Sequence, residues 1–142
     1  MLLRIAMTRL PSPADAEDVV QEVFLKLLTA RPQFRDPEHE KAWLIRATLH
    51  RACDMARAAA RRDLPLEDAE LLPGGELPEP SPILSAVQAL PAKYSAVIHL
   101  YYYEGYSIQE ISKLLRLPVP TVGTRLSRGR ERLRRLLKED VE

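Results

Sequence analysis

Hydrophobic residues recur every three to four positions along most of the chain, which is the period of amphipathic α-helices. Before the middle of the chain, this pattern predicts three helical stretches: residues 2–10, a helix that begins at Ser12, and a helix over about 36–62. Ser12 would be the N-cap of the second helix, with Pro13 at the first helical position and Asp15 completing a capping box. The apolar stripe of that helix consists of Ala16, Val19, Val20, Val23, Phe24, Leu27 and Leu28.

The same period returns after residue 82 and predicts four more helices. The four helices begin at Ser81-Pro82, at Pro91, at a capping box formed by Ser107–Glu110, and at about Pro120. Gly105 ends the second helix, a turn at Arg116–Pro118 follows the third, and the fourth runs to about Lys138. Residues 107–126 have the spacing of a helix-turn-helix, in which a tight turn joins two short amphipathic helices. No strand pattern or internal repeat is present in the sequence. The predicted fold is therefore all-α, with two small helical bundles.

Charge divides the chain into three parts, although the net charge is only +1. Residues 1–62 hold 11 basic and 8 acidic residues, residues 63–82 hold 6 acidic and none basic, and residues 83–142 hold 10 basic and 6 acidic. The middle part also holds five of the 12 prolines. Because proline resists helix formation and like charges extend a chain, we expect an acidic, flexible linker at 63–82 between one domain at 1–62 and another at 83–142.

The last predicted helix is a candidate for DNA binding. Between Arg116 and Lys138 there are 8 basic residues and one acidic residue. The major groove of DNA admits one α-helix, and clustered cations neutralise phosphates. Thr121 and Thr124 would add hydroxyl contacts near the N-terminus of this helix. A basic helix alone is equally consistent with a solvated surface, whereas the helix-turn-helix spacing favours DNA.

Aromatic residues are assigned mainly to the core. A tyrosine cluster at helical spacing is more typical of a core or core edge than of a platform for stacked bases, and its members are Tyr101, Tyr102, Tyr103 and Tyr106. Trp43 is also expected in the core. Phe34 lies in a basic loop, residues 31–36, next to a basic helix, so it either plugs the core or holds an extruded base.

Two helices of the N-terminal half carry opposite charges on their outer faces. The face of the helix after Ser12 is acidic and consists of Asp15, Asp18, Gln21 and Glu22. The following helix has a basic side that consists of Arg46, His50, Arg51, Arg57, Arg61 and Arg62. An acidic face of this kind is either solvated or fits a basic protein surface.

No catalytic or metal site is indicated. His50 and Cys53 lie one helical turn apart, but zinc needs three or four ligands, and the other two histidines are remote in sequence. Neither a glycine-rich phosphate loop nor a catalytic triad is recognisable. We therefore expect no enzymatic activity, no cofactor and no small-molecule substrate. The single cysteine, the lack of an apolar run of roughly 20 residues and the lack of a signal peptide predict a cytoplasmic protein without membrane insertion.

Five sequence runs occur in an order that is typical of one protein family. They are DAEDVVQEVF at 15–24, AWLIR at 42–46, ALPAKYSAV at 89–97, EGYSIQEI at 104–111 and TRLSRGRERL at 124–133. Together they resemble the bacterial RNA polymerase sigma factors. Because the chain has counterparts of only the second and fourth regions, joined by a linker, it is similar to the extracytoplasmic-function (ECF) group of the sigma-70 family. The resemblance covers nearly the whole chain.

This resemblance implies a role for each candidate site. Residues implied to dock on the clamp helices of the largest polymerase subunit are Asp18, Gln21 and Glu22. Residues implied to bind the minus-ten element are Phe34, Arg46, His50, Arg51 and Arg57. Residues implied to bind the minus-thirty-five element are Thr121, Thr124, Arg125, Arg128 and Arg132. The implied partners are core RNA polymerase, at its clamp helices and flap region, promoter DNA, and an anti-sigma factor.

Four features depart from the family pattern. The family's first helix is largely absent, His50 replaces a common asparagine, Arg116 stands at a turn where glycine is usual, and Gly123 replaces a basic residue. A left-handed Arg116 would cost about 1 kcal/mol, and Gly123 would cost about 1 kcal/mol of helix propensity. The short N-terminal half leaves two functions open: a sigma factor that directs initiation, or a non-initiating helix-turn-helix regulator whose N-terminal half only binds proteins. Runoff transcription with core polymerase would separate them.

Overall fold

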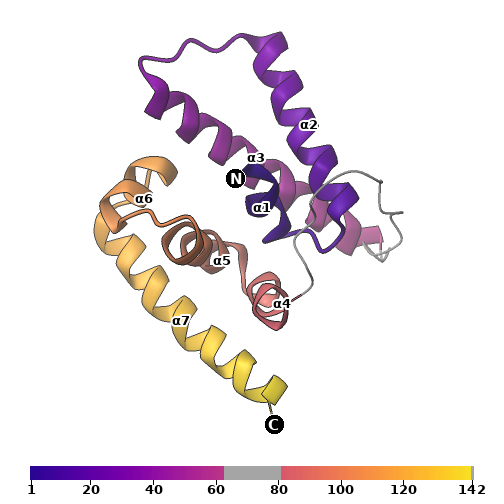
Figure 1. The fold of residues 1–142 in the computed structure, drawn as a ribbon, viewed down its shortest axis with the longest axis vertical. Coiled ribbons are helices and arrows are strands. Elements are labelled where there is room, and N and C mark those ends of the chain that lie inside the picture. Colours follow the sequence, from indigo (N-terminus) through magenta and orange to yellow (C-terminus); the bar gives the residue numbers. More distant parts are fainter. Residues whose placement is uncertain (63–80, 142) are drawn as a thin grey trace. The chain divides into compact units, whose positions relative to one another are not determined.

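The computed structural model describes residues 1–62 and 81–141, and all regular structure in these two stretches is helical (Figure 1). The chain divides into two compact units, Met1–Pro78 and Glu79–Glu142. The predicted all-α fold with two helical bundles is confirmed. The predicted linker lies outside the described residues except for Ser81 and Pro82, which are the N-cap and first residue of a helix. None of the described helices contains a stretch long and apolar enough to span a bilayer.

Residues 1–62 of the N-terminal unit form three helices that all contact one another: α1 (Leu2–Met7), α2 (Pro13–Ala30) and α3 (Pro37–Arg62). They enclose a small apolar core. Burial of each larger aliphatic side chain in such a core contributes roughly 1.5–3 kcal/mol. The buried hydrophobic residues of the unit are Leu2, Ile5, Ala6, Met7, Leu10, Ala16, Val19, Val23, Ala42, Ile45 and Ala52.

Helix α2 begins at the predicted N-cap, Ser12, but without the reciprocal Asp15 bond of the predicted capping box, and it buries less of its apolar stripe than predicted. The Ser12 hydroxyl accepts a hydrogen bond from the backbone N–H of Asp15 at 3.4 Å. Along the stripe, however, burial ends at Val23, and Phe24 and Leu28 are 45% and 70% exposed. In Figure 1 the short helix α1 lies beside the N-terminal half of α2, and the C-terminal half extends past it. The later part of the stripe is therefore exposed because α1 does not reach it.

The C-terminal unit is built around its last helix. In chain order its elements are α4 (Pro82–Ala89), α5 (Ala92–Ile98), the π-helix η1 (His99–Tyr103), α6 (Ile108–Leu115) and α7 (Val119–Val141). Helix α7 packs against α4, α5 and α6, so one long helix supports three short ones. The buried hydrophobic residues of this unit are Ala86, Val87, Leu90, Tyr94, Val97, Ile98, Leu100, Ile111, Leu114, Val122 and Leu126.

The turn between α6 and α7 has the predicted helix-turn-helix geometry. The Ser107 hydroxyl accepts from the N–H of Glu110 at 3.1 Å, and the Glu110 carboxylate accepts from the N–H of Ser107 at 3.0 Å, which completes the predicted capping box. Arg116 ends α6 in the left-handed region with a φ of 56°, as predicted. The N–H of Leu117 donates to the carbonyl of Ser112 at 3.0 Å and closes the turn.

The tyrosine cluster differs from the prediction. Tyr101–Tyr103 are exposed, and Tyr103 is 67% exposed, so their assignment to the core or its edge is wrong, whereas the half-buried Tyr106 agrees with a position at the core edge. Three consecutive residues on one helix cannot all face the core, and the wide turn of η1 directs His99 and Leu100 inward instead. Nε2 of the buried His99 lies 2.8 Å from the Glu104 carboxylate, so a polar pair closes this end of the core.

Candidate nucleic-acid interface

A groove of about 360 Å³ lies between α5 and the N-terminal part of α7. Its lining residues are Lys93, Tyr94, Pro120, Thr121, Thr124, Arg125 and Arg128. They include four of the five residues predicted to bind the minus-thirty-five element. The fifth, Arg132, lies one helical turn further along α7, with its guanidinium carbon 5.0 Å from the centre of the Tyr94 ring. The helical period thus places all five on the side of α7 that faces the start of α5.

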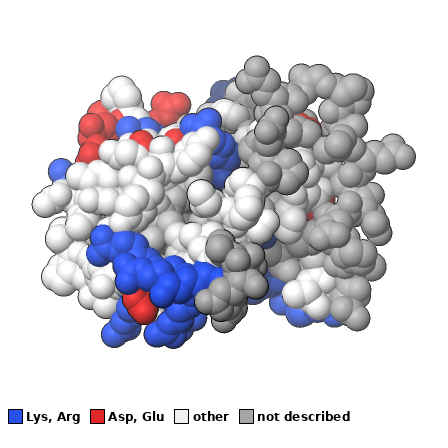
Figure 2. All heavy atoms as spheres, turned by 60° about the horizontal axis from the view of Figure 1, so that its bottom comes forward, with Lys and Arg blue, Asp and Glu red and all other residues white. Residues whose placement is uncertain are grey.

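Helix α7 carries its basic residues outside and its small or apolar residues inside. Val122, Leu126 and Gly129 are buried, one turn apart along one side. The exposed basic residues of the helix are Arg128, Arg130, Arg132, Arg134, Arg135 and Lys138. Figure 2 shows Lys and Arg side chains gathered into a continuous patch around an acidic side chain. On α7, the Glu131 carboxylate lies 3.8 Å from Arg134 and 3.6 Å from Arg135. Because Glu131 is the only acidic residue between Val119 and Lys138, against six exposed cations, this part of the helix stays strongly positive.

Tyr94 lies among three cations. The Arg132 guanidinium and the Lys93 ammonium lie 5.0 and 5.1 Å from the centre of its ring, and Arg128 lines the same groove. Burial alone would raise the pKa of Tyr94, but the positive charges of Lys93, Arg132 and Arg128 lower it below the ordinary value. A buried aromatic ring with cations around it provides both cation–π contacts and a hydrogen-bond acceptor for the arginines.

A glycine allows α5 and α7 to approach closely at this groove. A Cβ atom added at Gly129 would lie 3.0 Å from Cγ1 of Ile98, 3.2 Å from Cδ1 of Ile98 and 3.3 Å from Cβ of Tyr94. Such contacts are tighter than ordinary packing allows. The missing side chain at Gly129 therefore brings Tyr94 against the row of arginines on α7.

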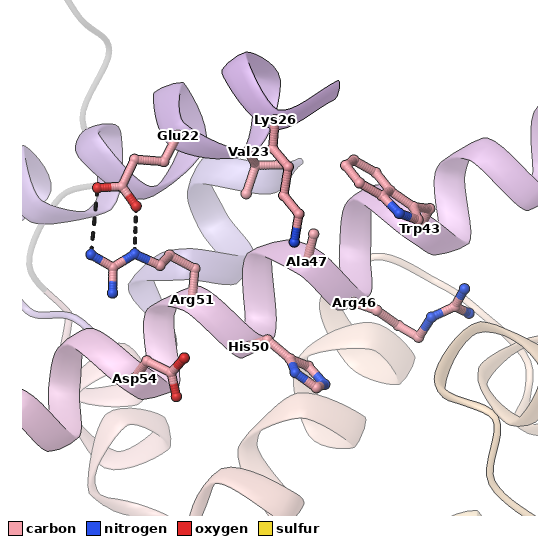
Figure 3. Close-up of a pocket in the computed structure, with 9 residues that line it drawn as sticks. All are labelled: Glu22, Val23, Lys26, Trp43, Arg46, Ala47, His50, Arg51 and Asp54. Carbon is pink, nitrogen blue, oxygen red and sulfur yellow. Dashed lines mark hydrogen bonds and ion pairs between the residues drawn. The ribbon is translucent and has the colours of Figure 1, made fainter. Parts of the chain in front are cut away.

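A second hollow, of about 400 Å³, lies between α2 and α3 in the N-terminal unit (Figure 3). Three of the predicted minus-ten residues line it: Arg46, His50 and Arg51. In Figure 3, Arg51 points toward α2, whereas Arg46 and His50 point away from that helix on a neighbouring row of α3. Lys26 of α2 also lines the hollow, and its ammonium group points toward α3.

An ion pair joins two residues that were predicted to serve different partners. The Arg51 guanidinium donates two hydrogen bonds to the Glu22 carboxylate, one of them from Nη2 at 3.4 Å. This hydrogen bonding raises the pKa of Arg51 above its ordinary value. Another predicted minus-ten residue, Arg57, lies outside the hollow and donates to Asp54 at 2.5 Å. Both arginines are thus paired with carboxylates of this unit.

Phe34 and Trp43 belong to a small aromatic cluster at the start of α3. The Phe34 ring meets the rings of His39 and Trp43 edge-on, with centroids 5.4 and 5.9 Å apart. Phe34 is half-buried. Trp43 is also half-buried and lines the hollow beside α2, so its assignment to the core is wrong. Its ring lies beside the C-terminal part of α2, in which no residue after Val23 is buried.

The acidic face of α2 is accessible. Asp18, Gln21 and Glu22 are all exposed, and they lie within one turn and a half of the helix. Asp15 is more enclosed; burial, and then the nearby charge of Asp18, raise the pKa of this carboxyl group. The predicted docking residues thus form one exposed patch, and one of them, Glu22, forms an ion pair with Arg51 of α3.

The described residues hold no cluster of three or more His, Cys, Asp or Glu side chains arranged to bind a metal ion. Cys53 is half-buried, and burial raises the pKa of its thiol despite the opposing charge of Arg9. A raised pKa makes a cysteine less reactive, because the thiolate is the nucleophile and the metal ligand.

Sequence reasoning missed three residues at these sites. Lys93 and Tyr94 line the groove beside the predicted residues of α7, and Lys26 lines the hollow beside α3. A usable signal was present for Lys93, because Pro91 marks a helix start and places this lysine in the first turn. The signal for Tyr94 was ambiguous, since its spacing is also that of a core residue.

Two family models match the chain. The model described as "Sigma-70 region 2" matches residues 1–62, and "Sigma-70, region 4" matches residues 81–133. Among similar curated proteins, RNA polymerase sigma factor SigV of Bacillus subtilis is 30% identical, over 97% of this chain and 86% of that protein. ECF RNA polymerase sigma factor SigW of the same organism is 31% identical, over 88% of this chain and 76% of that protein.

A solved structure has the same fold. It is the sigma factor RpoE in complex with the anti-sigma factor NepR from Bartonella quintana, with a TM-score of 0.73 and 24% sequence identity. The alignment covers 96% of this chain and 89% of that one. The arrangement of helices is therefore one that a sigma factor adopts.

Proposed function

The chain belongs to the ECF group of the sigma-70 family, and from this premise we propose how its residues divide the work of promoter recognition. As a member of that family it is a transcription initiation factor, which binds core RNA polymerase and directs it to promoter DNA. The match of residues 1–62 to region 2 favours this function over a non-initiating regulator. Sigma factors are not enzymes, and we assign no catalytic step to this chain. Its place of action would be the cytoplasm, where core polymerase works.

Residues 83–142 would form the domain that reads the minus-thirty-five element through α7. The observation that carries this assignment is the groove beside α5, at which Thr121, Thr124, Arg125 and Arg128 converge. Threonine hydroxyls and arginine guanidinium groups on one helix face can contact base edges and phosphates in the major groove. The exposed arginines further along α7 would add contacts to the DNA backbone, which strengthen binding to any sequence.

Residues 1–62 would form the domain that serves two partners. The exposed patch of Asp18, Gln21 and Glu22 would dock on the clamp helices of the polymerase. The hollow between α2 and α3, with Arg46, His50 and Arg51 beside Trp43, would receive the minus-ten element, with Phe34 at its edge and Arg57 on the same helix. Because RpoE was solved with an anti-sigma factor, we also propose a regulator of that kind as a partner of this chain.

Runoff transcription with purified core polymerase and a pool of promoter fragments tests this function. The wild-type chain should initiate transcription, whereas the double variant Asp18→Arg/Glu22→Arg should lose both co-purification with core enzyme and transcripts. The control Glu38→Arg/Glu40→Arg changes the charge equally but leaves α2 untouched, and it should retain both. Co-purification of the first double variant at the wild-type level would remove the docking role. DNA binding by the wild type without any transcripts would favour the non-initiating regulator.

A further inference from the structure

We propose that Tyr94 is a positioning residue for promoter recognition, which holds Arg128 and Arg132 in the orientation in which they meet DNA. The inference rests on the proposed function of α7 and extends the reading surface to a second helix. Tyr94 belongs to α5, which precedes the helix-turn-helix, and it is only 4% exposed. It therefore cannot contact much of the DNA itself and would act through the two arginines.

The position of Tyr94 is fixed by packing. A Cβ atom added at Gly129 would lie only 3.3 Å from the Cβ atom of Tyr94. The Tyr94 side chain of α5 therefore packs closely against the backbone of α7 at this glycine. Gly129 directly follows Arg128 and lies three residues before Arg132. A tyrosine packed at Gly129 is therefore close to one arginine on each side of that glycine, Arg128 and Arg132.

The two arginines would use different parts of the tyrosine. Arg132 lies over the ring, 5.0 Å from its centre, and Arg128 lines the groove beside Tyr94, where its guanidinium would donate a hydrogen bond to the phenol oxygen. Both arginine side chains are otherwise exposed. A free arginine side chain has many rotamers, and ordering it on binding costs free energy. A tyrosine that orders the guanidinium beforehand lowers this cost and strengthens DNA binding.

The cations around Tyr94 also favour a negatively charged ligand. Lys93, Arg128 and Arg132 converge on one ring and repel one another. A DNA phosphate placed among them would relieve this repulsion, which ties the arrangement to a polyanion rather than to fold stability. The same helix provides a contrast: Arg130 donates a hydrogen bond to the Tyr102 phenol at 3.1 Å, and neither residue lines the groove.

Fluorescence anisotropy with the full chain tests the proposal. The probe is a labelled 20-base-pair duplex recovered by the wild-type chain from a randomised pool. Tyr94→Phe removes only the phenol oxygen and should weaken binding about fivefold, which is within the range for the net contribution of one intramolecular hydrogen bond. Arg128→Ala should weaken binding about tenfold, and adding Tyr94→Phe to it should cause no further loss. Combined with Arg125→Ala, Tyr94→Phe should keep its fivefold effect.

Two controls separate positioning from stability. Tyr102→Phe removes the phenol–arginine hydrogen bond with Arg130, which lies outside the groove, and the affinity of this variant should stay within about twofold of the wild type. Circular dichroism in urea identifies any variant that is not folded under the binding conditions. Binding by Tyr94→Phe equal to the wild type, or losses that multiply with those of Arg128→Ala, would overturn the proposal while leaving α7 as the DNA reader. Unchanged binding by Arg128→Ala and Arg125→Ala would overturn both.

Discussion

The two interior glycines of α7 have opposite surroundings, which makes them a matched test of how rigidly α5 and α7 pack. A Cβ added at Gly123 meets no atom within 4 Å, whereas a Cβ at Gly129 meets Ile98 and Tyr94 at 3.0–3.3 Å. Substitution by alanine changes the chain by the same single carbon at both positions. Any difference between Gly123→Ala and Gly129→Ala therefore reports the surroundings.

The expected magnitudes follow from two opposing effects. Replacing glycine by alanine inside a helix gains about 1 kcal/mol of stability. At Gly123 nothing opposes this gain, so the free energy of unfolding of the C-terminal unit should rise by about that amount. At Gly129 the extra carbon overpacks a core in which Ile98 and Tyr94 are buried, and overpacking costs about 1–3 kcal/mol. The net effect there should be a loss of up to about 2 kcal/mol.

The aromatic residues allow each unit to be followed separately during urea unfolding. All five tyrosines lie in the C-terminal unit, and the single tryptophan, Trp43, lies in the N-terminal unit. The tyrosine signal should move to higher urea for Gly123→Ala and to lower urea for Gly129→Ala, while the tryptophan transition stays in place. If Gly129→Ala stabilises the tyrosine transition as much as Gly123→Ala does, α5 and α7 separate freely, and close packing at Gly129 does not fix the position of Tyr94.

Two further predictions concern polar pairs of unequal burial. Glu22→Gln removes the Glu22–Arg51 ion pair, whose side chains are 48% and 42% exposed. The free energy of unfolding, followed by the tryptophan signal, should fall by only about 0.2–1 kcal/mol. In 1 M salt, where the Debye length is about 3 Å, this difference should disappear, and a larger loss that persists there would contradict the prediction. Glu104→Ala deprives the buried His99 of its 2.8 Å partner and should cost about 2–4 kcal/mol in the tyrosine signal; a cost below about 1 kcal/mol would show that water replaces the carboxylate.

Local signals in the sequence predicted the helix ends well. Ser12, Ser81 and Ser107 are all N-caps whose hydroxyls accept from the third following residue, and Arg116 ends α6 in the left-handed region. Such signals are readable because capping chemistry depends only on residues three or four apart. The groove residues of α7 were predictable for the same reason, since one helix carries them.

Features that depend on distant residues were not predictable in this way. Whether Phe24 is covered depends on how far α1 extends along α2, and the period of α2 alone does not contain that information. The π-helix turned Tyr103 outward because it changes the helical period at one point. The pair of Glu22 and Arg51 joins two helices, and the contact of Tyr94 with the arginines of α7 depends on the close approach at Gly129.

Under the roles proposed above for Glu22 and Arg51, their ion pair would make polymerase docking and DNA binding thermodynamically dependent on each other. A polymerase surface that captures the carboxylate leaves the guanidinium with an uncompensated charge, and its attraction for a DNA phosphate increases. Linkage requires the reverse as well: DNA that captures the guanidinium strengthens the hold on polymerase by the same factor. Since an exposed pair contributes at most about 1 kcal/mol, that factor is at most about fivefold. The two proposed binding events would thus reinforce each other, and the energy of a single solvent-exposed contact would limit the effect.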